Sequence, residues 1–343
     1  MPRIIKIAAV QMIARPASLS ERLARAETLV VRAAHEGAQL VVLPEVFNTG
    51  YEYSDANYGR AEPLDGPTAS WMKQTATHCD VHLAGTFLRL DGQDIYNTLL
   101  LVAPEGRAWR YDKNHPWGWE RAYFCAGSDV TVADTALGRL GLLICWDVVH
   151  PELWARYAGH VDAMVICSCP PALHDWTLIF PDGKRFKTEK ADPAMRHIKR
   201  TSAGIFGPCL LRQATFLGVP VVNTTGTGIF SSGVPSPRAS LATYALAHPG
   251  LWKYIPQAEA VRIETGYFNE TYVANAAGQV LQRVPPEAEA YALAEVTLAD
   301  APPQPRGKQP PFGISVLAYM FDVCVNRLSS LVYRRNVRRI RGR

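Results

Sequence analysis

A carboxylate, an amine and a thiol each follow an apolar run typical of a buried strand, and they belong to Glu45, Lys113 and Cys145. Side chains at the ends of neighbouring strands can meet in one pocket, because the strands of a sheet lie side by side. A thiol next to a base and a cation is an arrangement that activates a cysteine nucleophile. Cys145 is therefore the candidate nucleophile, Glu45 the candidate base and Lys113 the candidate cation.

Each of these residues alone has an ordinary structural interpretation. A cysteine after an apolar strand is more often a small core residue. A lysine at a strand end is usually solvated, and Glu45 after Pro44 could cap a turn. It is the joint pattern of the three that favours catalysis.

Short apolar runs alternate with helical patterns along most of the chain. Helical spacing of apolar residues predicts helices over 18–36, 71–78, 151–157 and 210–217. Apolar runs predict strands over 4–10, 39–43, 81–88, 140–145, 163–167, 219–223 and 291–296. Turn residues at 104–106 and 276–278 predict two hairpins. The mixture predicts an α/β fold with mixed sheets, in which helices cover one face of a sheet and a second sheet covers the other.

The motifs around the three residues resemble those of the nitrilase superfamily. They stand in the order of that family's Glu–Lys–Cys signature, as Leu43-Pro44-Glu45, Tyr111-Asp112-Lys113 and Ile144-Cys145-Trp146-Asp147, followed by His150-Pro151-Glu152. The stretch 119–128 resembles the family segment that holds a second glutamate, here Glu120. The resemblance covers about residues 3–300 and breaks at two long insertions rich in Pro, Gly and aromatic residues, at about 170–207 and 231–266. It implies a four-layer α-β-β-α sandwich spanning about 1–300, without a cofactor.

The resemblance also implies a role for each residue. Glu45 would act as general base, taking the thiol proton and later a proton from water. Lys113 would lower the pKa of Cys145 and stabilise the tetrahedral oxyanion, with the backbone N–H of Trp146 as second donor. Glu120 would orient Lys113 or assist as an acid or base. The product would be a thioester acyl-enzyme released by water.

The residues after the nucleophile bear on the substrate. Asp147 after Cys145-Trp146 leans toward amidases, as the resemblance implies, where a glutamate would lean toward nitrilases. Asp147 and Glu152 are expected to support a helix N-terminus rather than to do chemistry. The predicted function is hydrolysis of a linear amide. The alternatives are a nitrile or N-carbamoyl hydrolase, an acyltransferase using the same thioester, and an inert scaffold at membranes.

Other motifs favour neither a metal nor a cofactor. Cys167 and Cys169 lack a matched second pair, and His174 complements them poorly as a zinc ligand. Gly226-Thr227-Gly228 lacks the full dinucleotide-binding pattern and favours a turn. The seven cysteines are an odd number, and no secretory signal precedes the first strand, so we expect a cytoplasmic protein with reduced thiols.

The C-terminal region differs in composition from the rest. Residues 301–311 contain five prolines and predict an extended linker. The following segment, 312–343, predicts a basic amphipathic helix. Its expected apolar face consists of Leu317, Met320, Phe321, Cys324, Leu328, Leu331 and Val332. Its expected polar face consists of Ser315, Asp322, Asn326, Ser329 and Asn336.

Two interpretations of this helix stay open. Its 14-residue apolar run is shorter than the ~20 residues that span a bilayer, whereas an apolar face beside arginines is typical of a helix lying on the inner membrane surface. The substrate would then be hydrophobic or lipid-derived. The other interpretation is an arm that packs on a partner subunit, and the resemblance implies a homodimer or larger assembly.

The net charge of +5 belongs to this tail. Seven arginines lie between Arg327 and Arg343, and without them 29 basic residues remain against 31 acidic ones, so residues 1–326 carry −2. A protein that binds nucleic acid through its folded domain usually presents a basic face. The charge distribution therefore disfavours a nucleic-acid partner.

Overall fold

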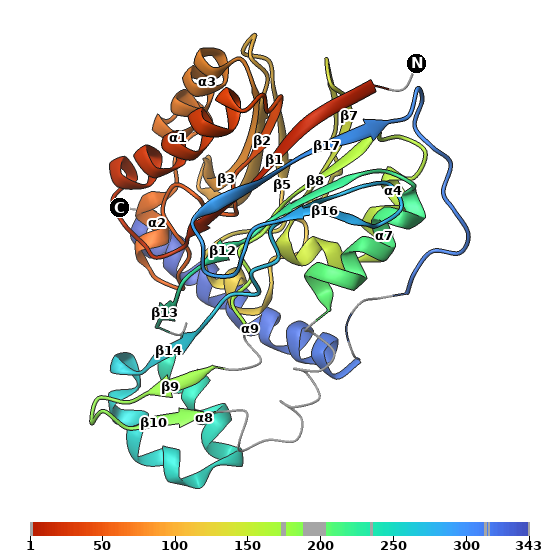
Figure 1. Ribbon diagram of the computed structural model, residues 1–343. Coiled ribbons are helices and arrows are strands. Elements are labelled where there is room, and N and C mark those ends of the chain that lie inside the picture. Colours follow the sequence, from red (N-terminus) through yellow and green to blue (C-terminus); the bar gives the residue numbers. More distant parts are fainter. Residues whose placement is uncertain are drawn as a thin grey trace.

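The computed structural model describes residues 3–172, 176–187, 204–233, 236–311, 314 and 316–341. Two large β-sheets lie face to face, and helices pack outside them (Figure 1). A smaller sheet with its own helix stands at one end of the molecule (Figure 1). The expected mixed α/β fold is confirmed.

The first sheet has seven strands in the order β12-β1-β2-β3-β4-β5, with β17 also paired to β1. The strands are β1 (Arg3–Ile13), β2 (Leu40–Val42), β3 (His82–Asp91), β4 (Asp94–Val102), β5 (Ala108–Asp112), β12 (Gly226–Thr227) and β17 (Ala290–Leu298). Successive side chains of a strand point to opposite faces. Ile7 and Ala9 therefore join the core between the sheets, whereas Ala8 and Val10 join the core under the helices.

The helices over the first sheet are α1 (Leu19–His35) and α3 (Pro67–Cys79). The Ser18 hydroxyl accepts the Glu21 backbone N–H at 3.3 Å, so Ser18 is the N-cap of α1. Gly37, just past the end of α1, has a φ of +87°, a conformation that glycine adopts without cost. The predicted boundaries of α1 are correct to within one residue.

The second sheet has six strands in the order β16-β15-β11-β8-β7-β6. These are β6 (Val132–Thr135), β7 (Gly138–Ile144), β8 (Ala163–Cys167), β11 (Val221–Thr224), β15 (Tyr272–Ala274) and β16 (Val280–Arg283). The helices α4 (Pro151–Tyr157) and α7 (Leu210–Leu217) share its core, to which Trp154 and Tyr157 contribute fully buried rings. Both predicted hairpins, β4–β5 and β15–β16, are present.

The described residues of the two predicted insertions include short strands. These strands form an antiparallel sheet in the order β10-β9-β14-β13. Its elements are β9 (Thr177–Ile179), β10 (Arg185–Lys187), β13 (Phe230–Ser232) and β14 (Arg262–Thr265), with α8 (Pro237–Ala247) and the 3-10 segment η4 (Pro249–Ala260) beside them. Stacked rings of Phe180 and Tyr254, with centroids 3.9 Å apart, join the two insertions. Their aromatic residues belong to a buried cluster that also contains Tyr53, Trp119 and Tyr123, which composition alone did not reveal.

The predicted C-terminal segment contains the helix α9 (Val316–Arg341). Asp322 and Ser329, expected on the polar face, are only 5% and 6% exposed, whereas Leu331, expected on the apolar face, is 61% exposed. The helix therefore turns part of its polar side toward the protein. Ser315 and the side chains of Leu317, Met320, Phe321, Cys324, Asn326 and Leu328 lie outside the described part.

Helix α9 packs against the short helix α2 (Ala56–Arg60) and the 3-10 turn η1 (Gly118–Ala122) of its own chain (Figure 1). Within the described residues, no helix combines the length and the apolar character needed to cross a bilayer. Residues 301–311 contain no helix or strand. They lie along α4 and α7, since the Arg306 backbone N–H donates to the Phe216 carbonyl at 2.7 Å and the Gln213 amide donates to the Pro310 carbonyl at 3.3 Å.

Candidate active site

The three candidate catalytic residues come from strand ends of both large sheets. Glu45 follows β2, Lys113 follows β5, and Cys145 follows β7 at the start of the 3-10 turn η2 (Cys145–Val149). The Lys113 ammonium lies 2.8 Å from Glu45 Oε1, and Cys145 lies close enough to the Glu45 carboxylate to influence its pKa. The structure therefore brings together the residues that the sequence placed 68 and 100 positions apart.

Glu120 completes a buried cluster of charges. Glu120 lies on η1 rather than at a strand end, and its Oε2 atom is 2.7 Å from the Lys113 ammonium. The Glu45 and Lys113 side chains have no exposed surface and that of Glu120 has 2%. Two carboxylates therefore share one ammonium in a site closed to solvent, where such interactions are much stronger than in water.

Further groups hold the two carboxylates. The Asn97 side-chain amide on β4 donates to Glu45 Oε1 at 2.7 Å, and the Cys169 backbone N–H donates to Glu45 Oε2 at 3.0 Å. The Tyr51 hydroxyl donates a hydrogen bond to Glu120 Oε1. Neither Asn97 nor Tyr51 was predicted from the sequence. Asn97 stands just before the apolar run at the end of β4, and only this position could have indicated it.

Cys145 occupies an unusual backbone conformation, with a φ of +46°. A non-glycine residue in this left-handed region costs of order 1–3 kcal/mol, and such residues cluster at functional sites. The turn places the sulfur beside Glu45, with only 5% of the residue exposed. Val46, next to Glu45, has the same φ. Two of the three strand ends thus carry strained backbone at or next to the candidate catalytic residue.

Burial dominates the protonation equilibria of the site. Burial raises the pKa of Glu45 above its usual value, although the Lys113 charge opposes this. Burial acts to lower the pKa of Lys113, but the charges of Glu120 and Glu45 outweigh it and keep that pKa well above its usual range. Lys113 is therefore charged at neutral pH.

The same balance corrects the expectation for the nucleophile. Burial and then the Glu45 charge raise the pKa of the Cys145 thiol well above its usual value. Lys113 does act to lower this pKa, as predicted, but its effect is the smaller one. The resting sulfur is therefore a thiol, and the arrangement suits transfer of its proton to Glu45 during attack rather than a preformed thiolate.

Asp147 supports the nucleophile turn from within. Its carboxylate accepts the Tyr111 hydroxyl at 2.8 Å, the His115 backbone N–H at 2.8 Å and the Ile144 backbone N–H at 3.2 Å. Burial raises its pKa to about 6. It therefore braces η2 itself and does not cap the following helix α4. Glu152, by contrast, lies in the first turn of α4, as expected.

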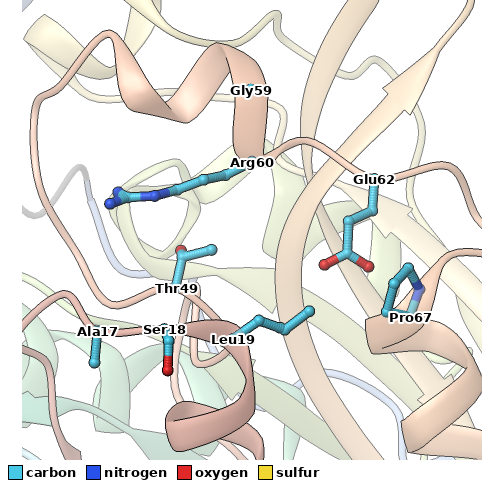
Figure 2. A pocket seen from close by; sticks show the side chains of 8 residues that line it. All are labelled: Ala17, Ser18, Leu19, Thr49, Gly59, Arg60, Glu62 and Pro67. Carbon is cyan, nitrogen blue, oxygen red and sulfur yellow. The ribbon is translucent and has the colours of Figure 1, made fainter.

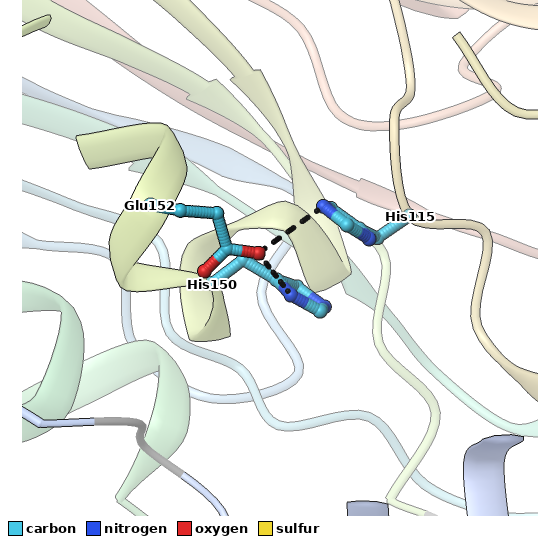
Figure 3. A group of neighbouring side chains, drawn as sticks. All are labelled: His115, His150 and Glu152. Atoms are coloured by element: carbon cyan, nitrogen blue, oxygen red, sulfur yellow. Dashed lines mark hydrogen bonds and ion pairs between the residues drawn. The ribbon is translucent and has the colours of Figure 1, made fainter. Parts of the chain in front are cut away.

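Among the described residues, one group has donor atoms close enough to hold a metal ion: His115, His150 and Glu152, with atoms within 4.8 Å of one another (Figure 3). The two imidazole rings are stacked, with centroids 3.5 Å apart and planes 7° from parallel. Ring nitrogens direct their lone pairs within the ring plane, so two stacked rings cannot both point at one ion. Glu152 Oε1 instead lies 3.1 Å from His150 Nδ1 and 3.7 Å from His115 Nε2.

A separate cavity of about 540 Å³ lies at the start of α1 (Figure 2), lined by Ala17, Ser18, Leu19, Thr49, Gly59, Arg60, Glu62 and Pro67. Its charged groups are already engaged. The Arg60 guanidinium lies 2.5 Å from Glu52, and the Glu62 carboxylate accepts both the backbone N–H and the hydroxyl of Thr68 at 2.7 Å. None of the four clustered charged and thiol residues lines this cavity, so it is not the candidate site.

The α/β fold with two facing sheets and the buried Glu–Lys–Cys cluster are the features expected of a cysteine hydrolase. Comparison with known protein families tests this expectation. Residues 6–190 match the carbon-nitrogen hydrolase family, and the chain belongs to that family. The predicted resemblance to the nitrilase superfamily is thereby confirmed.

Two relatives illustrate the match. A nitrilase of Pyrococcus abyssi is 31% identical over 153 residues, which is 43% of this chain and 58% of the relative. An (R)-stereoselective amidase of Pseudomonas sp. is 33% identical over 162 residues, which is 47% of this chain and 58% of the relative. The matched part of the chain thus spans 58% of the length of each.

The fold is also found in solved structures. The crystal structure of an amidase from Nesterenkonia sp. is similar with a TM-score of 0.61, and the match covers 85% of this chain and 89% of the amidase at 19% identity. At this level of identity the similarity concerns the fold.

Proposed function

We propose that the chain hydrolyses the C–N bond of a linear amide through a thioester on Cys145. The observation that carries this proposal is the buried cluster in which the Lys113 ammonium lies within 2.8 Å of both Glu45 and Glu120, with the buried Cys145 beside them. Membership of the carbon-nitrogen hydrolase family supports the type of reaction.

The proposed reaction has two halves. The Cys145 thiol transfers its proton to Glu45 as its sulfur bonds to the amide carbon, and the ammonium of Lys113 and the Trp146 backbone N–H stabilise the oxyanion. The C–N bond then breaks, and the leaving amine takes the proton from Glu45. Water next attacks the thioester carbon and gives a proton to Glu45. The C–S bond breaks, the carboxylic acid leaves, and Glu45 returns the proton to the Cys145 sulfur. Glu120 keeps Lys113 in place.

An amide is favoured over a nitrile because an aspartate, Asp147, follows Cys145-Trp146, and this aspartate is built into the turn through three hydrogen bonds. A nitrile or N-carbamoyl substrate, or transfer of the acyl group to an amine, would use the same thioester and remains an outcome of the experiment below. An inert scaffold would require none of the buried charges, and burying unused charges is costly.

The experiment combines turnover with intact mass. Ammonia release is measured on a panel of linear amides, nitriles and N-carbamoyl compounds, and trapped acyl adducts are located by mass. Cys145→Ala should abolish both signals. Cys167→Ala, which removes another buried thiol on β8, should leave them unchanged. Turnover that persists in Cys145→Ala would end the proposal, and an acyl product on an added amine would identify a transferase.

We further propose that the two large sheets with α1 and α3 outside one and α4 and α7 outside the other form a four-layer α-β-β-α sandwich. The division at about residue 300, the insertions at about 170–207 and 231–266, and the 312–343 segment as an appended helical element belong to this proposal. Assembly into a homodimer or larger oligomer is also proposed, and light scattering coupled to gel filtration tests it. A monomeric mass would exclude the assembly.

The outward side of α9 supports a second proposal, contact with an anionic membrane surface. Leu331 is 61% and Ile340 39% exposed, and Arg334, Arg335 and Arg338 are exposed beside them. An apolar strip among arginines is typical of such helices. Flotation with phosphatidylserine vesicles should be lost in Leu331→Ser/Arg335→Glu/Arg338→Glu, which leaves the inward side of α9 intact. Equal flotation of both forms would exclude α9 as the membrane-binding element, and the proposal of a membrane-derived substrate would fall with it.

A further inference from the structure

The turn that carries Glu120 needs an external tie. The turn η1 begins at Gly118, whose φ of +39° lies in the left-handed region. Glycine occupies many backbone conformations, so its own sterics do not fix the turn. Yet the Glu120 carboxylate must stay within 2.7 Å of the Lys113 ammonium and of the Trp117 backbone N–H.

Helix α9 supplies a tie of this kind. Asp322 Oδ1 accepts the Gly118 backbone N–H at 2.7 Å, across 204 positions of sequence, and Asp322 is 5% exposed. A carboxylate is costly to bury unless it is hydrogen-bonded. A charged acceptor on the first N–H of the turn also acts as an N-cap does, but from another element.

Helix α9 has a second anchor farther along its length, at Tyr333. The Tyr333 hydroxyl accepts the Ile95 backbone N–H at 2.9 Å and donates to the Asp94 carboxylate at 3.1 Å. Tyr333 is 5% exposed, and its ring centroid lies 6.3 Å from that of Tyr58 on α2. In Figure 1 one end of α9 lies near α2, and the helix also contacts η1.

We propose that Asp322 is a positioning residue, which holds η1 so that Glu120 orients Lys113, and that docking of α9 thereby completes the active site. The inference rests on the proposed function. It assigns the C-terminal helix a role in catalysis that is separate from any contact its outer face makes. A displacement of about 1 Å at a catalytic group can cost about 10²-fold in rate.

The test compares three variants in the full-length chain. Asp322→Ala removes the acceptor, Asp322→Asn keeps an oxygen for the Gly118 N–H, and Tyr333→Phe loosens α9 at a site that does not touch η1. We expect Asp322→Ala to lower kcat at least about tenfold with little change in KM. We expect Asp322→Asn to stay within about threefold of the wild type, and Tyr333→Phe, which loosens the anchor of α9, to lower Tm and also to lower kcat, by less than Asp322→Ala does.

A double-mutant cycle shows whether Asp322 acts through Glu120. In a Glu120→Gln background, Asp322→Ala should have no further effect on kcat, because coupled residues are non-additive. The same cycle on the rate of Cys145 alkylation by iodoacetamide, followed by intact mass, needs no amide substrate. If the wild type hydrolyses no amide, the proposed function fails, while this arm still decides the role of Asp322. An Asp322→Ala effect of equal size in both backgrounds, or a lower Tm with unchanged kcat and alkylation rate, would overturn the inference.

Discussion

Replacement of Lys113 by methionine removes the cation of the site while keeping the length of the side chain. The ammonium lies 2.8 Å from Glu45 and 2.7 Å from Glu120 with no exposed surface, so the variant leaves two buried carboxylates without a counter-charge. Breaking a buried ion pair by removing one partner costs about 3–5 kcal/mol. The free energy of unfolding of a typical protein is about 5–15 kcal/mol. The variant should therefore still fold, but it should unfold at a clearly lower urea concentration than the wild type.

The loss of stability in Lys113→Met should depend on pH in a definite direction. Burial already raises the pKa of Glu45 in the folded state, and loss of the opposing Lys113 charge raises it further. A carboxyl whose folded pKa exceeds its unfolded pKa binds more protons when folded, so stability falls as pH rises through that window. The variant should therefore approach the wild type as pH drops from 7.5 to 5. Each unit of added shift contributes about 1.4 kcal/mol.

Urea unfolding followed by circular dichroism at pH 7.5 and 5 measures both quantities. Lys73→Met, on the exposed face of α3, is the matched control and should unfold like the wild type at both pH values. Turnover of Lys113→Met should fall about 10²–10³-fold, the usual effect of losing an oxyanion donor. A stability loss below about 1 kcal/mol that is the same at both pH values would refute the buried, charged arrangement.

Three further predictions follow from the same geometry. Glu45→Gln should lower kcat about 10²–10⁴-fold in an ammonia-release assay, and wild-type kcat/KM should fall as pH drops through a Glu45 pKa above 4.5; an unaltered rate would exclude Glu45 as the base. Burial is the chief cause that lowers the pKa values of the stacked His115 and His150 to about 4. As the pH falls from 6.5 toward 4, these histidines take up protons in the unfolded chain before they do so in the folded protein, so the free energy of unfolding should fall. His150→Gln should make that fall smaller in urea titrations. Gly127→Ala places a methyl group 2.4 Å from the Asp112 carbonyl oxygen and should cost about 1–3 kcal/mol, seen as a lower Tm, whereas Gly59→Ala, with open space around it, should not.

The large sheets were predictable because their signals are local. A strand such as β8, predicted over 163–167, is a continuous apolar run, and α1 combines helical spacing with a capping serine. The small sheet was not predictable in the same way. Its strands β9, β10 and β13 have three residues each and pair only across insertions that are far apart in sequence.

The helix α9 shows what a local pattern leaves open. Helical spacing predicted an apolar face with Leu331 and a polar face with Asp322, but not which of the two meets the rest of the chain. In the structure Asp322 is buried, where its carboxylate accepts the Gly118 N–H, and Leu331 is exposed. No periodicity of the helix contains that information, since the partner lies on another element.

By itself, the sequence determined the residues of the Glu–Lys–Cys cluster, their order, and the strands that end at them, because these depend on residue type and short-range pattern. Only the tertiary structure decided which groups surround them. Asn97 donates to Glu45, Tyr51 donates to Glu120, and Asp322 accepts a hydrogen bond from the turn η1. It also decided that the Cys145 sulfur rests as a thiol. Burial and charge act through space, and the groups that supply them lie 52 to 204 positions apart along the chain.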